Sequence, residues 1–216
     1  MVKKAAVSSA RRRPGRPRHP VTREQLLAAA RTVFAEQGFA AGSMTSVAEQ
    51  VGIRKASLFH HFASKDALYQ EVMTATLLEL GQLLARVSDS LTGDFGQRLD
   101  LLTRELNAYL GEHLEVTRLL FRDLLFDGPF FAGRGRQLVM QVFQGTVQFF
   151  ERDMDSGVLP RQDARHLVLT MLGVHFTYWA AEVLRREAFG DTEDGGVLQR
   201  AEVVRRQVRW MCGLPA

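Results

Sequence analysis

Cationic and small polar side chains gather near the start of the chain in two stretches, RRRPGRPRH (residues 11–19) and SMTSVAEQVGIRKASLFHHFASKD (residues 43–66). Arg and Lys bind phosphates and guanine edges, and Ser, Thr and His donate short hydrogen bonds to the same targets. In the second stretch, two apolar segments flank Gly52, which is typical of two short helices joined by a tight turn. The two stretches together predict a surface that binds double-stranded DNA.

The positive charge of the chain is local. Residues 1–70 contain 12 of the 28 Lys and Arg but only 4 of the 24 Asp and Glu, so they carry a net charge of +8 and the remaining residues carry −4. A basic head on a mildly acidic body favours nucleic-acid binding, because counterions are released where the cations cluster. For residues 11–19 alone, a solvated basic tail is an equal alternative.

Length and composition limit the remaining possibilities. A chain of 216 residues with 46% hydrophobic residues can bury a substantial core. No apolar run approaches the roughly 20 residues of a spanning helix, and the first ten residues lack the apolar segment of a secretory signal. These features predict a cytoplasmic protein without membrane contact. The one cysteine, Cys212, excludes an internal disulfide and is expected to pack in the core.

The segment before the motif predicts an arm and a scaffold helix. Residues 1–20 are rich in Arg, Pro, Ser and Ala without periodicity, so a disordered basic arm is expected there. Thr22 and Gln25 have the spacing of a capping box, and Gly38 predicts the end of the first helix. The apolar stripe of this helix consists of Leu26, Leu27, Ala30, Val33 and Phe34.

Two short helices and a longer one follow. Ser43 predicts the N-cap of the second helix, and Gly52 permits the turn after it. The third helix is expected to begin near Lys55, with one buried face. That face carries Leu58 and Phe62. A fourth helix, capped by Ser64, extends toward Leu91 with an apolar stripe that includes Leu68, Val72, Leu77, Leu80 and Leu84.

The rest of the chain has helical periodicity divided by glycine and proline. The predicted segments are 94–112, 113–127, 131–156, 161–189 and 196–212. With the first four helices they make about nine, and no alternation typical of strands occurs. The predicted fold class is all-α.

One family shares the pattern of the second, third and fourth helices. The matching positions are Ala48, Gly52, Ile53, Leu58, the run Phe59-His60-His61-Phe62, Lys65 and Leu68. On these residues the stretch 22–70 resembles the DNA-binding domain of the tetracycline-repressor (TetR) family of transcriptional regulators. The resemblance implies a helix-turn-helix domain over residues 21–68 and a helical effector-binding and dimerisation domain over residues 69–216. It implies a ligand-responsive repressor without cofactor or catalytic residues.

Two residues depart from the common pattern of that family. Ala56 stands where glycine is frequent, and alanine favours a helix by up to about 1 kcal/mol over glycine. Phe59 stands where tyrosine is usual. Phe59 has no hydroxyl for a phosphate, but its ring can contact a thymine methyl group.

The candidate DNA contacts divide by chemistry. Those expected at base edges are Arg54, Lys55, Ser57 and His60, with Phe59 beside them. Thr45 and Lys65 lie near predicted helix N-termini, where phosphates bind, and are expected to position the duplex. Pro14-Gly15-Arg16-Pro17-Arg18 resembles the core of an AT-hook peptide, so Arg16 is expected to enter the minor groove. Arg18 is a further expected DNA contact of this arm. His60 and His61 are not expected to bind a metal ion, because no Cys or Asp completes a set of ligands.

The last two predicted helices, 161–189 and 196–212, indicate a homodimer. The segment from Leu167 to Leu184 is apolar on nearly all sides, which one small body cannot cover. Packing against a second copy of the chain is the simplest way to bury this segment. Two-fold symmetry then predicts a palindromic operator with half-sites about one helical turn or somewhat more apart.

An effector pocket is expected among the aromatic residues of the body. Polar groups inside apolar stretches mark it best, because a buried donor needs a partner. The candidate pocket residues are Asn107, Tyr109, His113, Phe121, Phe126, Met140, Phe143, Thr146, His175 and Tyr178. The expected effector is a small apolar or aromatic molecule held by one or two hydrogen bonds.

Two other classes of function stay open at this point. An architectural DNA-binding protein would bind random DNA as tightly as its native sites. An enzyme would require converging acids, bases or a nucleophile, and the chain has no nucleophile elbow, phosphate loop or ligand-spaced Cys and His set. Turnover of any compound by the purified protein would favour that class.

Deletion of residues 1–18 tests the minor-groove role of the arm. The deletion removes Lys3, Lys4 and the five arginines of the arm, so the affinity for DNA is expected to fall and its dependence on salt to flatten. Fluorescence anisotropy over a salt series measures both effects. If binding is unchanged at every salt concentration, the arm makes no contact with DNA.

Overall fold

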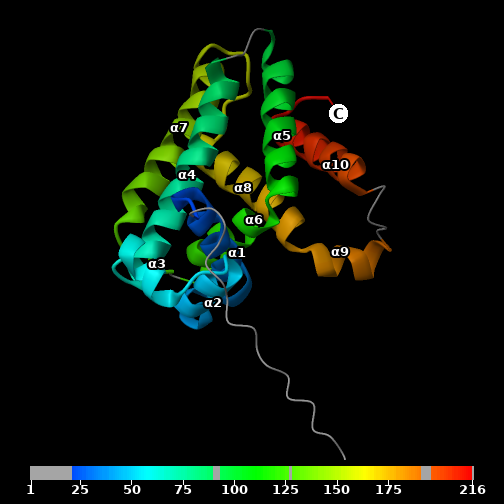
Figure 1. Cartoon of the computed structure of the whole chain (residues 1–216). Coiled ribbons are helices and arrows are strands. Elements are labelled where there is room, and N and C mark those ends of the chain that lie inside the picture. The colour runs from blue at the N-terminus through cyan, green and yellow to red at the C-terminus, as the bar shows by residue number, and fades with distance from the viewer. Residues whose placement is uncertain (1–20, 90–92, 127, 191–195, 216) are drawn as a thin grey trace, which may run out of the picture.

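The protein is a bundle of helices in which a small head sits at one end of a larger body (Figure 1). The computed structural model describes residues 21–89, 93–126, 128–190 and 196–215. The helices of the head and the helix leaving it are α1 (Arg23–Ala41), α2 (Met44–Gln50), α3 (Lys55–His61) and α4 (Lys65–Asp89). Those of the body are α5 (Phe95–Glu112), α6 (Leu114–Leu125), α7 (Gly135–Asp155), α8 (Ala164–Ala180), α9 (Glu182–Phe189) and α10 (Gly196–Met211).

The all-α prediction is confirmed, since the described residues form helices and no strand. The segment predicted as a single helix over 161–189 is two helices instead. Ala181 leaves the helical conformation with φ −84° and ψ 35°, and α9 starts in a new direction after it. Within the described ranges, no helix has both the length and the hydropathy to cross a membrane.

The predicted caps of the head are confirmed. The Thr22 hydroxyl accepts from the Gln25 backbone N–H (3.3 Å), and the Gln25 side chain accepts from the Thr22 backbone N–H (2.9 Å). Ser43 accepts from the N–H of Ser46 (3.0 Å) at the start of α2. Each cap satisfies a backbone donor that its helix leaves unpaired. Gly38 has φ 77° and breaks the regular part of α1, as predicted.

A left-handed glycine joins α2 to α3. Gly52 has φ 72°, and the N–H of Ile53 after it donates to the carbonyl of Ala48 (3.0 Å). The inner faces of the two helices are buried as predicted, with Val47 and Leu58 fully enclosed and Phe62 only 3% exposed. These residues anchor α3, so its other faces are left on the surface.

The head and the body share one continuous hydrophobic core. Its buried residues run from Leu26 of α1 to Trp179 of α8, and α4 crosses the predicted domain boundary at residues 68 and 69 without interruption. Two ion pairs spaced two turns apart fasten α1 to α4: Arg23 with Glu71 (2.6 Å) and Arg31 with Glu79 (2.8 Å). The head and α4 are therefore packed as one unit.

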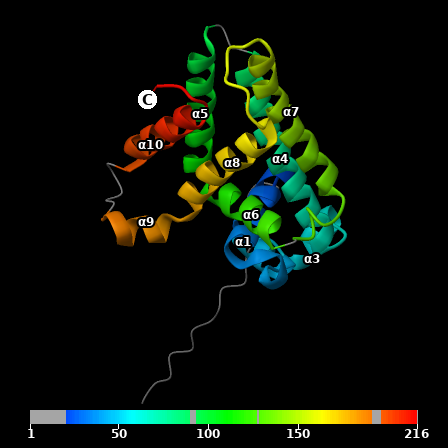
Figure 2. The same cartoon turned by 180° about the vertical axis from the view of Figure 1, so that it is seen from behind.

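A second core lies at the far end of the body, among α5, α7, α8 and α10. In the view from behind, α8 passes between α5 and α7 (Figure 2). Asp100 of α5 holds α10 through Arg209 (2.9 Å) and Arg205 (3.5 Å). Cys212 is fully buried in this core, which raises the pKa of its thiol to about 12, and its predicted packing role is confirmed.

The carboxylate of Asp123 joins α4 to the segment between α6 and α7. It accepts the Tyr69 hydroxyl (2.8 Å) and the backbone N–H of Phe131 (2.8 Å), and Asp123 itself is 2% exposed. Burial and this carboxylate raise the pKa of the Tyr69 phenol. Gly128 lies so close that an added Cβ would stand 2.0 Å from the Asp123 Oδ1 atom. Only glycine fits at that position.

Replacement of Asp123 tests the importance of this junction. Asp123→Ala leaves the Tyr69 hydroxyl and a backbone N–H without partners, so the free energy of unfolding is expected to fall by about 2–4 kcal/mol. Urea denaturation at a fixed protein concentration measures the change. The control is Asp155→Ala, whose partner Arg161 is exposed, and a loss of no more than about 0.5 kcal/mol is expected there. Equal losses in the two variants would contradict this account.

Candidate nucleic-acid interface and ligand cavity

The exposed face of α3 carries the predicted base-contacting residues. Arg54, Lys55, Ser57 and His60 are all exposed. Arg54 is the N-cap residue of α3, but its side chain makes no cap hydrogen bond. The opposite face is anchored by Leu58. The helix therefore presents a cationic and polar surface on a rigid support, which is the geometry a recognition helix needs for a major groove.

Phe59 lies on the same surface and is 44% exposed. The Lys55 ammonium lies 5.8 Å from the centre of its ring, within cation–π range. This contact holds the lysine near the aromatic face. Phe59 and Lys55 therefore form one small surface unit with an apolar and a cationic part.

The other two predicted contacts in the described residues differ from each other. Thr45 is exposed near the start of α2, where a phosphate contact is feasible. Lys65 instead donates to the backbone carbonyls of Phe39 (2.8 Å) and Ala40 (3.1 Å). Its ammonium also lies 4.6 Å from the Phe39 ring. In this structure Lys65 therefore binds backbone carbonyls at the end of α1. The predicted contacts Arg16 and Arg18 lie outside the described residues.

A cavity of about 320 Å³ lies in the body, bounded by α4, α5, α6, α7, α8 and the segment between α6 and α7. It opens to the surface, since the exposed side chains of Met140 and Leu169 are part of its wall. Its wall is almost entirely apolar. Four of the predicted pocket residues line it: Met140, Phe143, Thr146 and His175. The Thr146 hydroxyl donates to the carbonyl of Val142 (3.0 Å), so it already has a partner.

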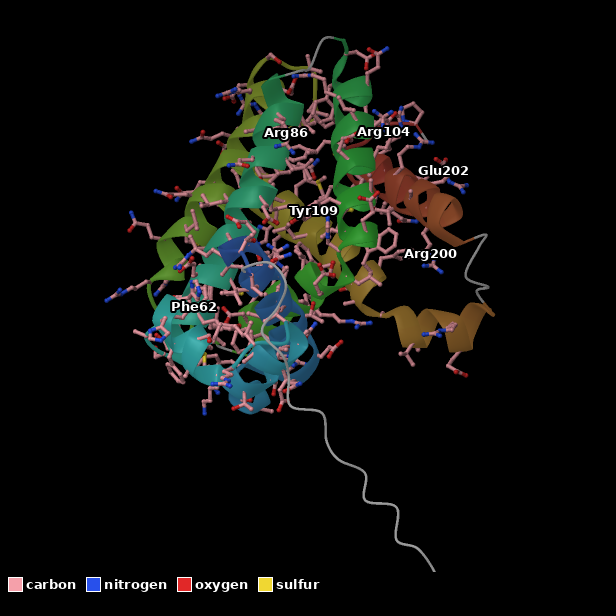
Figure 3. The ribbon with its side chains drawn as sticks, in the orientation of Figure 1. Phe62, Arg86, Arg104, Tyr109, Arg200 and Glu202 are labelled. Atoms are coloured by element: carbon pink, nitrogen blue, oxygen red, sulfur yellow. The ribbon has the colours of Figure 1, made fainter. Side chains whose placement is uncertain are left out.

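The other six predicted pocket residues do not line this cavity. Asn107 accepts the indole N–H of Trp179 (2.9 Å) in the contact between α5 and α8. The Tyr109 hydroxyl donates to Glu79 (3.1 Å), and Figure 3 shows Tyr109 between α4 and α5. Burial and the Glu79 carboxylate raise the pKa of the Tyr109 phenol.

The positions of the other four residues also have physical reasons. His113 separates α5 from α6 and faces Glu115 (Nδ1 to Oε1, 3.5 Å). Phe126 ends α6 and is 76% exposed. Phe121 packs against the core shared with the head, and Tyr178 packs against the second core. Polar or aromatic type alone did not distinguish a cavity wall from other buried or surface positions.

The largest omission from the prediction is the wall formed by α4. This wall consists of Met73, Leu77, Leu80 and Leu84. Their spacing follows one helical face, and three of them belong to the apolar stripe expected for the fourth helix. The stripe continues far beyond the head, which was the available indication that α4 also packs on a ligand cavity.

Two polar side chains in the cavity wall have unpaired atoms. Thr103 is 1% exposed and His175 is 2% exposed. The Thr103 Oγ1 atom and the His175 Nε2 atom are buried without a hydrogen-bond partner among the described residues. Leaving a buried polar atom without a hydrogen bond lowers the free energy of unfolding by about 1–3 kcal/mol. Within the same ranges, no group of three or more His, Cys, Asp or Glu is placed to hold a metal ion.

The head has the architecture of helix-turn-helix DNA-binding proteins. Comparison with known proteins shows which family of such proteins it resembles. Residues 26–72 match the family described as bacterial regulatory proteins, tetR family. The HTH-type transcriptional repressor KstR2 of Mycolicibacterium smegmatis is 34% identical over 104 residues, which cover 48% of this chain and 51% of that protein. The HTH-type transcriptional regulator UidR of Escherichia coli K12 is 38% identical over 72 residues, 33% of this chain and 35% of that protein.

The whole fold matches solved structures of the same kind. The fatty acid degradation regulator FadR from Bacillus halodurans superimposes with a TM-score of 0.71 and 13% identity over 90% of this chain and 100% of that chain. Residues 26–72 thus resemble the tetR family of bacterial regulatory proteins, and the rest of the chain shares the fold of solved structures of that kind. The chain spans about half or less of the length of the curated relatives it matches.

Phe59→Tyr tests how the head meets DNA. The new hydroxyl would stand on an exposed ring and reach a phosphate, so operator affinity is expected to rise about three- to tenfold. Lys55→Ala is expected to lower affinity at least fivefold and to reduce the salt slope by about one.

Both variants are measured by fluorescence anisotropy on the selected operator described below. The matched control is Arg104→Ala, because Arg104 is an exposed cation on α5, away from the head (Figure 3). Its affinity is expected to equal that of the wild type. If Lys55→Ala lowers operator affinity no more than the control does, α3 is not part of the DNA interface.

Proposed function

We propose that the protein is an effector-responsive transcriptional repressor that binds a palindromic operator as a homodimer in the cytoplasm. The observation that carries the proposal is the exposed face of α3, where Arg54, Lys55, Ser57 and His60 stand opposite the buried anchor Leu58. The match of residues 26–72 to the tetR family and the similarity to the repressor KstR2 support the same function. An architectural DNA-binding protein would have no use for the cavity in the body.

The proposed dimer forms through α8 and α10. Leu169 of α8 is 57% exposed and Trp210 of α10 is 75% exposed in the single chain. Large apolar side chains exposed to this extent mark an interaction surface when they lie close together. The two helices pack against each other. A two-fold axis through them would cover both side chains and hold two heads at a set separation.

The proposed ligand response uses the cavity of about 320 Å³. AibR, a protein whose fold matches with a TM-score of 0.65 and 16% identity over 86% of this chain and 96% of that chain, has been solved in complex with isovaleryl coenzyme A and operator DNA. In the present chain, an effector would shift the population toward a separation of the heads that no longer fits the operator. Coupling of this type amounts to about 1–3 kcal/mol.

Selection of bound duplexes from a random DNA pool tests the function. The expected winners are inverted repeats whose half-site centres lie about one helical turn or somewhat more apart. Enrichment without symmetry or without any shared sequence would contradict a dimeric repressor. Equal affinity for random and selected DNA at physiological salt would favour the architectural alternative instead.

Trp210→Glu tests the dimer. A charge at the centre of the proposed interface is expected to raise the dimer dissociation constant at least thirtyfold and to weaken operator binding accordingly. Sedimentation velocity measures the first effect and fluorescence anisotropy the second. The matched control is Leu78→Glu, at an exposed apolar position on α4 (48% exposed), which is expected to remain dimeric. A dimeric Trp210→Glu variant would place the interface elsewhere.

A further inference from the structure

The contact between α5 and α8 holds the polar atoms of the cavity wall. The Trp179 indole N–H donates to the Asn107 side-chain oxygen (2.9 Å). The amide Nδ2 of Asn107 has no partner among the described residues, and one turn earlier on each helix two further polar side chains, Thr103 and His175, also have unpaired atoms. Both Thr103 and His175 line the cavity, and their unpaired polar atoms are buried directly behind its apolar surface.

The hydrogen-bonding capacity of His175 is determined by its surroundings. Its Nδ1 atom lies 2.8 Å from the carbonyl oxygen of Met171, and a carbonyl only accepts, so Nδ1 carries the proton. Burial lowers the pKa of His175 to about 4, so the ring is neutral at pH 7. Its Nε2 atom is consequently an unprotonated acceptor, and it has no donor among the described residues.

The charges of the cavity wall restrict the ligand further. Asp123 is the one ionisable carboxylate that lines the cavity, and no Lys or Arg lines it among the described residues. A buried anion would meet a carboxylate and no compensating cation. For size, an engineered cavity of about 150 Å³ binds benzene, so about 320 Å³ corresponds to roughly two rings or a medium alkyl chain.

We propose that the effector is an apolar molecule of about this size with one uncharged hydrogen-bond donor, an alcohol, phenol or amide N–H, which donates to Nε2 of His175. Thr103 Oγ1, which donates or accepts, bonds the same polar group of the effector. Neither atom has water-accessible surface in this structure. The effector reaches them when the apolar side chains of the wall shift, and it thereby stabilises a wider cavity. The inference rests on the sensing role proposed above.

Matched probes with one polar group test the inference. The probes are 2-naphthol, 2-methoxynaphthalene and 2-naphthoate, and on an alkyl scaffold 1-decanol, 1-methoxynonane and decanoate. Calorimetric titration of the full-length protein without DNA is expected to show the two donor probes binding at least tenfold tighter than their methoxy analogues and their anions. Equal binding within each set, tighter binding of the anions, or no binding by either donor probe would overturn the proposal.

Two substitutions locate the contact. His175→Phe and Thr103→Val remove the polar atoms but keep most of the apolar volume, so each is expected to reduce the preference for the donor over its methoxy analogue at least fivefold. The control is His166→Phe on the exposed side of the same helix, which is expected to keep the full preference. A His175→Phe variant that retains the preference would overturn the assignment.

A spectroscopic measurement does not depend on the variants. The ¹⁵N resonance of the unprotonated Nε2 of His175 is expected to move toward the protonated range when 2-naphthol binds, and to stay in place with 2-methoxynaphthalene. No movement with 2-naphthol would also overturn the proposal. These measurements contain no DNA, so their outcome is independent of the operator selection. The effector proposal can therefore fail while the DNA-binding proposal succeeds, and the DNA-binding proposal can fail while the effector proposal succeeds.

Discussion

The buried carboxylate of Asp123 is the interaction on which the relation between head and body depends. It is 2% exposed, and it accepts hydrogen bonds from the Tyr69 hydroxyl of α4 and from the backbone of Phe131. The Tyr69 ring packs edge-on against Phe34 of the head, with their centres 5.1 Å apart. A buried charge of this kind persists only when its partners stay in place. It therefore ties the position of α4 to the segment that follows α6.

The same carboxylate lies in the wall of the cavity, together with Phe130, whose side chain is 1% exposed. A ligand that displaces this part of the wall acts directly on the partner of Tyr69. On the other side of the junction, the ion pairs of Arg23 and Arg31 fasten α1 to α4. Close-packed cores change between discrete arrangements and do not deform smoothly. In the proposed ligand response, a shift at the cavity would therefore reach the head as a movement of α4.

The sequence predicts what depends on neighbouring residues along the chain. The capping box at Thr22, the cap at Ser43 and the glycine turn at position 52 need only local geometry, and all three are confirmed. The cavity wall depends on which helices meet, and no local pattern shows that Tyr109 turns toward Glu79 while Thr103 lines the cavity. The break at Ala181 was missed for a related reason, because alanine favours a helix and the change of direction follows from packing. Tertiary contacts decide these positions.

Unpaired polar atoms in the cavity wall are a cost to this state of the protein, and that cost explains how an effector can act on the equilibrium. A ligand shifts a population only as far as its affinity differs between the two states. Among the described residues, the Nε2 atom of His175 and the hydroxyl of Thr103 have no hydrogen-bond partner, and the apolar wall keeps them from water. A donor that reaches them gains its hydrogen bonds only in the wider state of the cavity. The difference in affinity between the two states then arises from those hydrogen bonds, which an apolar molecule of the same size cannot form.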